Sequence, residues 1–311
     1  MLDTPVEPVD QRLLATAISA AANPIFIADH AGCIVWVNAA FSERTGYSAQ
    51  EAKDQTPRLL KSGRQDASFY RDLWQTILAG YVWRGEVVEK TKDGALYTAD
   101  QVITPLTDAD GIVTHFVAIQ HDITVRKRAT EREHFLAYHD ALTGLYNRAF
   151  FLGLLQQATA PAKRGSNSFA LLFLDVDKFK PVNDTFGHAI GDRLLSAIAE
   201  RLSAAVRKST DAVARLSGDE FAILQADIAD PNAALALGRK LHQLISQIFV
   251  LDGRKVQSGV SIGIAMYPAH GETPEQLLRN ADAAMYLAKN SGRGNCQLYD
   301  PARCPPLPRD P

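Results

Sequence analysis

The chain has 311 residues, of which 46% are hydrophobic and 22% charged. A single core stops growing at roughly 250–300 residues, so this length indicates two domains, and the composition excludes a wholly disordered, collagen-like or disulfide-scaffold protein. Lys and Arg number 33 against 35 Asp and Glu, so the basic excess of a general nucleic-acid-binding protein is missing. The longest apolar run, Phe169–Leu174, is far shorter than the ~20 residues of a membrane-spanning helix. We therefore expect neither nucleic acid nor membrane as a partner.

The first part of the chain has the pattern of a small α+β domain. Residues 1–21 are expected to form a short lead and an amphipathic helix. Two strand-like runs flank a hairpin signal at Gly32, helical spacing covers 39–80, and three more strand-like runs follow, separated by Asp-Gly turns. We predict an antiparallel five-stranded sheet with short helices over residues 22–124.

Residues 125–138 are charged and contain neither Gly nor Pro, which predicts a connecting helix. From residue 139 to 300, helices and strands alternate in an α/β pattern that places helices on the faces of a sheet. The Pro-rich tail 301–311 is expected to be disordered. The predicted helices lie around 148–158, 188–207, 232–247 and 274–290, and the predicted strands are Phe169–Val176, Ala212–Leu216, Phe221–Gln225 and Val256–Met266.

Acidic side chains gather at two places in this second part. Asp175 and Asp177 end a buried strand and point to the same face, because strand side chains alternate. Asp219 and Glu220 sit at a hairpin tip. If the two strands are neighbours, three or four carboxylates converge, which is favourable only when a cation neutralises them. Oxygen ligands beside a phosphate suit Mg²⁺. The plainer alternative is a set of solvated turn carboxylates.

Basic side chains stand where a phosphate could meet these acids. The segment Lys178–Lys180 opens a loop whose backbone amides, with Lys180 as counter-charge, are suited to phosphate groups. Lys289 and Arg293 lie at the end of a predicted helix, four residues apart, where cations also complement the helix dipole.

Two polar side chains could recognise a purine, and one glycine could admit a ligand. Asn183 offers a donor and an acceptor, and the Asp192 carboxylate accepts two N–H groups, which matches guanine better than adenine. Gly218 allows the backbone to approach a ligand closely, although a role in the turn alone is equally simple.

The segment Ser217–Phe221 resembles the signature of GGDEF-domain diguanylate cyclases, and further blocks at 140–148, 175–188, 261–265 and 281–289 agree with that family. The resemblance covers about 135–300. It implies a palm-like nucleotide-cyclase fold, Mg²⁺ or Mn²⁺ as the metal, and condensation of two GTP into cyclic di-GMP with release of two pyrophosphates. It also implies a homodimer of facing domains in the bacterial cytoplasm, which the three scattered cysteines suit.

The resemblance also implies a role for each matching position. The metal ligands are Asp175, the carbonyl of Val176, and Asp219, and the catalytic residues are Asp219, Glu220 and Lys180. The GTP contacts are Lys178, Phe179, Lys180, Asn183, Asp192, Gly218, Lys289 and Arg293.

Two positions depart from the family pattern. Ser217 replaces the first Gly of the signature, and we expect activity to survive unless that position needs a positive φ. The R-x-x-D of the family's product-inhibition site is Lys208 to Asp211 here, with Arg207 one residue early. Lys lacks the bidentate fork of Arg, so this degenerate inhibitory site predicts weak or absent product inhibition.

Residues 22–124 resemble a PAS sensor domain, which implies dimerisation through this domain and the following helix. FAD is a candidate ligand, because Leu59–Gly63 and Trp83–Gly85 resemble FAD-binding PAS domains; haem bound by His115 or His121 is a weaker alternative. The segments that carry the resemblance are Asn23–Pro24, Val37–Phe41, Thr45–Tyr47, Trp83–Gly85, Lys92–Gly94 and Asp122–Thr124.

Three functions follow from these patterns. The first is a diguanylate cyclase regulated by its PAS domain. The second is a catalytically inactive module that binds GTP or cyclic di-GMP, which the Ser217 variant suggests. The third is the front part of a longer protein with a GGDEF and an EAL phosphodiesterase domain. The first is favoured, because a degenerate domain would have lost several of the residues Asp175, Lys180, Asp219, Glu220, Lys289 and Arg293.

Overall fold

The computed structural model describes residues 10–160 and 168–304. The chain divides into two compact units, Met1–Glu131 and Arg132–Pro311. Most of the predicted lead, 1–9, and of the predicted tail, 305–311, lies outside the described residues. Within the described ranges, no helix combines the length and the apolar character that crossing a membrane requires.

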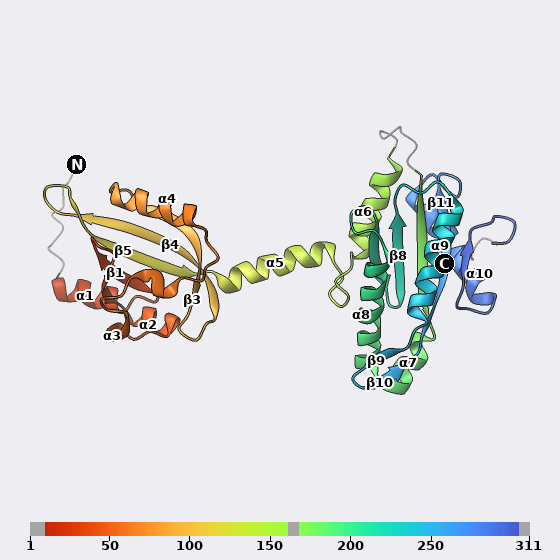
Figure 1. The fold of residues 1–311 in the computed structure, drawn as a ribbon, viewed down its shortest axis with the longest axis horizontal. Helices are drawn as coiled ribbons and strands as arrows, with labels where there is room; N and C mark the ends of the chain where they lie inside the picture. Colours follow the sequence, from red (N-terminus) through yellow and green to blue (C-terminus); the bar gives the residue numbers. More distant parts are fainter. Residues whose placement is uncertain (1–9, 161–167, 305–311) are drawn as a thin grey trace, which may run out of the picture. The chain divides into compact units, whose positions relative to one another are not determined.

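The first unit is built on one antiparallel sheet (Figure 1). Its strands run in the order β2-β1-β5-β4-β3, so the first strand of the chain lies beside a long pair of later strands. The strands are β1 (Ile25–Asp29), β2 (Ile34–Val37), β3 (Trp83–Lys90), β4 (Leu96–Thr107) and β5 (Val113–Asp122). This is the five-stranded sheet that the sequence predicted.

One short helix precedes the first strand of this sheet and four short helical segments connect its second and third strands, and polar caps fix where several of them begin. The Asn38 side chain accepts from the Phe41 amide, Ser48 and Glu51 form a capping box, and Asp66 accepts from the Phe69 amide. The elements are α1 (Gln11–Ser19), α2 (Ala39–Thr45), α3 (Ala49–Ala52), the 3₁₀ turn η1 (Pro57–Leu60) and α4 (Ala67–Leu78). Their apolar side chains join the sheet in one core that contains Phe26, Phe41, Leu73 and Trp83.

Helix α5 (Thr124–Tyr138) follows β5 directly, and none of its residues is buried. The Asp122 carboxylate accepts from the Thr124 amide, the first amide of the helix. At the other end, the side-chain amide of Asn147 donates to the carbonyls of Leu136 and Ala137. Two of the last helical carbonyls, which have no partner inside a helix, are thereby satisfied.

The second unit is a five-stranded sheet in the order β12-β11-β6-β8-β7, with helices on both faces (Figure 1). Its strands are β6 (Phe169–Asp177), β7 (Ala212–Ser217), β8 (Glu220–Gln225), β11 (Gly259–Tyr267) and β12 (Cys296–Leu298). Helices α8 (His188–Ala205) and α9 (Pro231–Ile245) cover one face, and α6 (Arg148–Thr159) and α10 (Pro274–Asn290) cover the other.

The central strand β6 explains this two-faced burial. Its even positions, such as Leu172 and Leu174, join the core under α8 and α9, and its odd positions, such as Leu171 and Phe173, join the core under α10. A strand that is buried on both faces has a continuous run of apolar residues, and this run is why β6 could be predicted from the sequence. On the α10 side, Gly263 of β11 is indispensable, because an added Cβ would lie 1.9 Å from the Ala281 carbonyl oxygen.

Two sequence predictions were wrong in this unit. The predicted strand Val256–Met266 is two elements: β10 (Arg254–Val256) pairs with β9 (Phe249–Leu251) as a separate hairpin, and β11 starts at Gly259. Asp252 and Gly253 both have positive φ, 48° and 76°, and they make the tight turn of that hairpin. The loop predicted to open at Lys178 is instead helix α7 (Phe179–Phe186), which buries Val182.

Candidate active site

The turn between β7 and β8 carries the acidic signature. Gly218 has a φ of 45°, and no atom would lie within 4 Å of an added Cβ, so its backbone faces open space. Ser217 keeps a negative φ, and its hydroxyl donates to the Glu220 carboxylate at 2.5 Å. The departure from Gly at 217 therefore brings no backbone strain and adds a contact that Gly cannot make.

Strand β6 brings a second carboxylate beside this turn. Asp175 lies opposite Glu220 in the β6–β8 ladder, and the Val176 amide donates to the Asp219 carbonyl at 3.1 Å. Burial raises the pKa of Asp175, the negative charges of Asp219 and Glu220 raise it further, and Lys289, 2.7 Å away, opposes this rise. Asp175 and Asp219 lie 44 residues apart in the sequence and meet where β6 ends. Lys289, on α10, supplies the positive charge there.

Asp177 has a different environment from Asp175. It is buried, and its carboxylate accepts from the Ser261 hydroxyl at 2.8 Å and from the Gly294 amide at 3.1 Å. Both carboxylates face the α10 side, as strand alternation predicts. Of the four carboxylates expected to converge, Asp219 and Glu220 lie near enough for their charges to act on Asp175, whereas Asp177 is held by its own donors. Among residues 10–160 and 168–304, no three His, Cys, Asp or Glu residues have the arrangement of a metal site. Lys289 contacts Asp175, and the Ser217 hydroxyl donates to Glu220.

Helix α7 starts immediately after these acids. Lys178, at its N-terminal boundary, has a φ of 59° and makes no side-chain cap, so the first amides of the helix have no side-chain acceptor there. Lys178 and Lys180 are exposed, and Phe179 packs against the core. The amides predicted in a loop are therefore offered by a helix start, where the dipole also favours an anion.

Asn183 on α7 and Asp192 on α8 lie at the meeting of these two helices. An added Cβ on Gly191 would be 1.8 Å from the Asn183 Oδ1, so Asn183 is packed directly against the residue before Asp192. The Asn183 Oδ1 is buried without a hydrogen-bond partner, while Asp192 is exposed. A buried oxygen without a partner is costly, and a donor from a ligand would remove that cost.

Comparison with known proteins agrees with this geometry. The family model "Diguanylate cyclase, GGDEF domain" matches residues 137–295, and the model "PAS fold" matches residues 12–123. The chain belongs to the GGDEF family of diguanylate cyclases. A PAS fold precedes its GGDEF domain.

Two curated relatives from Pseudomonas aeruginosa illustrate the match. The bifunctional diguanylate cyclase/cyclic di-GMP phosphodiesterase MucR is 48% identical over 165 residues, 53% of this chain and 24% of MucR. Diguanylate cyclase TpbB of strain UCBPP-PA14 is 46% identical over 164 residues, 53% of this chain and 38% of TpbB. This chain therefore spans less than half the length of either relative. A solved structure of the TpbB GGDEF domain alone is 45% identical, with a TM-score of 0.50, over 52% of this chain and 95% of that one.

The GGDEF domain has a donor set that fits a hard divalent cation. The candidate donors are the carboxylates of Asp175 and Asp219 and the carbonyl of Val176, and all of them are oxygens. Burial and mutual repulsion raise the pKa of Asp175, and a cation between such groups would relieve both effects. Arg293 lies four residues beyond Lys289, exposed, with a φ of 60°.

At the positions predicted to form a degenerate inhibitory site, Arg207 pairs with Asp211. Arg207 binds Asp211 with both arms of its guanidinium, Nη2 to Oδ1 at 2.7 Å and Nε to Oδ2 at 3.2 Å. The Asp211 side chain is only 2% exposed, and its Oδ1 also accepts from the Ala226 amide. Lys208 is exposed and makes no such contact with Asp211.

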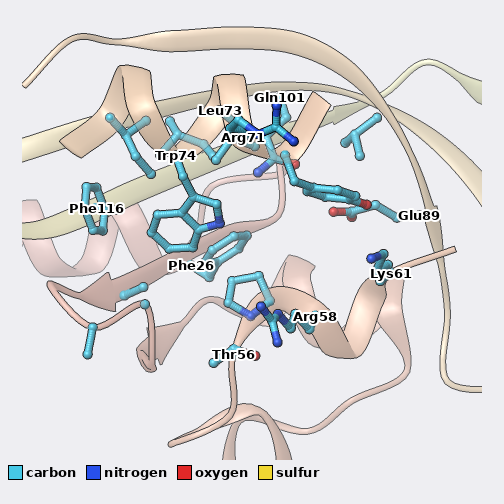
Figure 2. A pocket seen from close by; sticks show the side chains of 18 of the residues that line it. Phe26, Thr56, Arg58, Lys61, Arg71, Leu73, Trp74, Glu89, Gln101 and Phe116 are labelled. Carbon is cyan, nitrogen blue, oxygen red and sulfur yellow. The ribbon is translucent and has the colours of Figure 1, made fainter. Parts of the chain in front are cut away.

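The PAS fold encloses a pocket of about 720 Å³ (Figure 2). Aromatic side chains of Phe26, Trp74 and Phe116 line it, and Glu89 and Gln101 supply polar atoms. Pockets of ~300–1,000 Å³ with a few polar groups are typical of small organic ligands.

Glu89 is the buried carboxyl of this pocket. It accepts from the Tyr97 hydroxyl at 2.6 Å and from the Gln120 amide at 2.8 Å. Burial raises the pKa of Glu89 to about 7, although these two hydrogen bonds lower it. His115 and His121, the haem candidates, are exposed on β5 and do not line the pocket.

Sequence reasoning also missed an ion pair beside the signature turn. Arg215 contacts Asp140, a residue noted only within a block that carries the family resemblance. No spacing rule connects positions so far apart, so this pair became visible only in the fold. The candidate residues that the fold does bring together are Asp175, Val176, Asp219, Glu220 and Lys289 at one edge, and Asn183 with Asp192 at the α7–α8 junction.

Proposed function

We propose that this protein is a diguanylate cyclase that condenses two GTP molecules into cyclic di-GMP and releases two pyrophosphates. The observation that carries the proposal is the joining of Asp175 and the Asp219 turn across β6 and β8, with Lys289 at 2.7 Å. Phosphoryl transfer needs mainly positioning and charge stabilisation, and this edge offers both. The GGDEF relatives described above carry the same activity in their names.

In this proposal, Asp175, Asp219 and the Val176 carbonyl hold Mg²⁺ or Mn²⁺. A metal ion bound there supplies charge neutralisation of the α-phosphate and a lower pKa of the 3′-hydroxyl. Asp219 accepts the proton of the attacking hydroxyl, and Glu220 lies beside it with its carboxylate held by Ser217. Lys180 stabilises the charge that develops on the phosphate in the transition state.

The triphosphate of GTP lies, in this proposal, at the start of α7. The free amides that follow Lys178, together with Phe179 and Lys180, provide donors, and Gly218 leaves open space for the substrate on the other side. Lys289 and Arg293 contact the outer phosphates. Because Lys289 pairs with Asp175 in this structure, it exchanges that partner for phosphate when substrate and metal bind.

Guanine recognition falls to Asn183 and Asp192. The exposed Asp192 carboxylate accepts from the N1–H and the exocyclic amine of guanine, groups that adenine cannot present in the same way. The unpartnered Oδ1 of Asn183 is the second acceptor. A base without these donors would leave the buried Asn183 oxygen without a hydrogen bond, so such a base would bind less tightly than guanine.

We further propose that the protein works as a homodimer in the cytoplasm. Each GGDEF domain binds one GTP, so two domains must face each other before the 3′-hydroxyls reach the opposite α-phosphates. Exposed apolar side chains on α5, including Val125, Phe135 and Leu136, give the two chains a surface for association. Three free cysteines suit a reducing compartment.

FAD is the proposed ligand of the PAS pocket. The aromatic walls suit a flat ring system, and Glu89 and Gln101 suit its polar edge. A bound flavin supplies redox chemistry, which would make this unit a redox sensor. Purified protein should then show the visible absorption of oxidised flavin, and a colourless protein that binds no added FAD would contradict this part.

The variant Asp219→Asn tests the proposed activity. Asn keeps the shape of the turn but loses the negative charge, so cyclic di-GMP formation from GTP and Mg²⁺ should fall by ~10²–10³. GTP binding, followed by equilibrium dialysis, should persist. Asp227→Asn, at a turn outside the site, is the matched control and should keep wild-type activity. Equal product formation by Asp219→Asn and wild type would contradict the assignment.

A further inference from the structure

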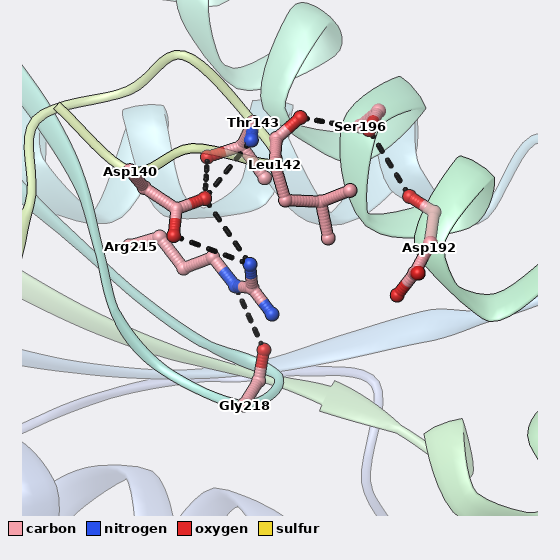
Figure 3. Close-up of polar contacts among 7 residues, drawn as sticks. All are labelled: Asp140, Leu142, Thr143, Asp192, Ser196, Arg215 and Gly218. Carbon is pink, nitrogen blue, oxygen red and sulfur yellow. Dashed lines mark hydrogen bonds and ion pairs between the residues drawn. The ribbon is translucent and has the colours of Figure 1, made fainter. Parts of the chain in front are cut away.

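The segment between α5 and α6 is connected to the signature turn by the guanidinium of Arg215, which contacts Asp140 of that segment (Figure 3). Arg215 Nη1 lies 3.1 Å and 3.3 Å from the two carboxylate oxygens of Asp140. The Nε of the same side chain donates to the Gly218 carbonyl at 2.9 Å. Arg215 therefore connects Asp140 to the residue that precedes Asp219.

Asp140 is held firmly before it meets Arg215. Its Oδ1 accepts from the Thr143 amide at 2.9 Å and from the Thr143 hydroxyl at 2.6 Å, and its own amide donates to the Leu145 carbonyl. Burial raises the pKa of Asp140, but the hydrogen bonds from Thr143 and Arg215 lower it more, so the carboxyl is charged at neutral pH. A fixed anion can orient a guanidinium fork, whereas a mobile one cannot.

The signature turn needs support of this kind. The register of the β7–β8 ladder shifts between Arg215 and Ser217, so pairing is irregular at Leu216 and only the pair Ser217–Glu220 follows before the turn. Gly218 is exposed, and an added Cβ would contact nothing within 4 Å. The Arg215 contact to the Gly218 carbonyl thus adds a hydrogen bond to the turn next to the place where the ladder is irregular.

The same segment also reaches the helix that carries Asp192. The Ser196 hydroxyl lies 3.3 Å from the Leu142 carbonyl and 3.1 Å from the Asp192 carbonyl, one turn earlier on α8 (Figure 3). The segment 140–143 therefore contacts both the turn that carries Asp219 and the helix that carries the proposed guanine contact.

We propose that Asp140 and Arg215 are positioning residues that set the place of Asp219 relative to the nucleotide held at α7 and α8. The inference rests on the proposed cyclase function, because it concerns the geometry of that reaction. Neither residue touches substrate. Their loss should therefore lower kcat and leave the KM for GTP nearly unchanged, because small displacements at a reacting group cost rate rather than binding.

Three substitutions in the full chain test this. Asp140→Asn keeps an acceptor for Thr143 but removes the charge facing Arg215, and Arg215→Lys keeps the charge but cannot reach Asp140 and Gly218 together. Both should lower kcat by about 10- to 100-fold with KM within about threefold. Asp140→Glu, which keeps the charge, should retain more activity than Asp140→Asn.

Asp252→Asn is the matched control. It removes the carboxylate from another ion pair of the same unit, Arg193–Asp252, whose side chains are 60% and 47% exposed against 15% and 24% for Arg215 and Asp140. Its kcat should equal that of wild type. A fall in kcat for Asp252→Asn as large as for Asp140→Asn would overturn the inference.

Hydrogen exchange gives a readout that does not depend on activity. The Val176 amide donates to the Asp219 carbonyl, so loosening of the turn should speed its exchange in Asp140→Asn and not in Asp252→Asn. If wild type makes no cyclic di-GMP, the proposed function fails, and exchange alone then decides the inference. Exchange at Val176 equal to wild type, or an unchanged kcat, overturns it. If Asp140→Asn does not fold, the same two measurements are read on Arg215→Lys.

Discussion

Burial raises the pKa of two carboxyls, Asp175 in the GGDEF domain and Glu89 in the PAS unit. Asp175 lies beside Asp219 and Glu220, with Lys289 to offset the repulsion, so its raised pKa marks a place where positive charge is needed. Glu89 has no cation within its hydrogen-bond network, and its pKa of about 7 results mainly from burial. The first carboxyl belongs to the proposed chemistry and the second to the PAS pocket.

The Glu89 carboxyl should make the stability of the PAS unit depend on pH. Its pKa is about 7 when folded and 4.5 for an ordinary solvated glutamate, so between these values the folded form keeps a proton that the unfolded form loses. The free energy of unfolding should fall by about 3 kcal/mol as pH rises from 4.5 to 7, and stay level above. Glu89→Gln should remove this slope.

Denaturant unfolding at several pH values measures the effect. All three tryptophans, Trp36, Trp74 and Trp83, lie in the PAS unit, so their fluorescence reports that unit selectively. Glu86→Gln is the control, because Glu86 is on the same strand and its side chain is 53% exposed. A Glu89→Gln protein with the pH slope of wild type would contradict the assigned role of burial.

At the scale of elements, the loop before β7 carries the positions that the sequence assigned to a degenerate inhibitory site. Arg207 holds the nearly buried Asp211, and Lys208 cannot replace a guanidinium fork. We therefore predict that cyclic di-GMP added at sub-micromolar concentration leaves the initial rate unchanged. Titration of product against the initial rate, with calorimetry for binding, measures this. Inhibition at sub-micromolar product would refute the prediction.

Which elements could be predicted follows from how they are stabilised. Strand β6 and helix α10 have long apolar patterns and clear ends, such as the capping box at Thr273, and they were predicted closely. The three-residue strand β12 has no pattern of its own and exists because it pairs with β11. The β9–β10 hairpin had a readable Asp252-Gly253 signal, but the predicted strand began after it, at Val256, and merged the last residue of β10 with β11.

Some features of the candidate site could also be predicted from the sequence, and others could not. The closeness of Asp175 to the Asp219 turn follows from two strands being neighbours, which acidic strand ends suggest. The partners of these residues could not be predicted, because Lys289 reaches Asp175 from another element and Arg207 reaches Asp211 by its rotamer. Side-chain pairing across elements depends on packing, and sequence spacing does not encode it.

At the scale of the whole molecule, the proposed reaction needs two GGDEF domains. The PAS unit and α5 would supply dimerisation, so a fragment that starts at residue 130 should lose it while keeping the second unit, Arg132–Pro311. At nanomolar protein, its activity per chain should be about tenfold or more below that of the full chain, because encounter becomes bimolecular. The difference should shrink as concentration rises. Equal activity at low concentration would contradict regulation through dimerisation.

The most direct measurement is product analysis of the full chain incubated with GTP and Mg²⁺. We expect cyclic di-GMP and pyrophosphate in a ratio of one to two, and no product when EDTA removes the metal. GTP that binds to the protein yet remains unconverted in the presence of Mg²⁺ or Mn²⁺ would contradict it.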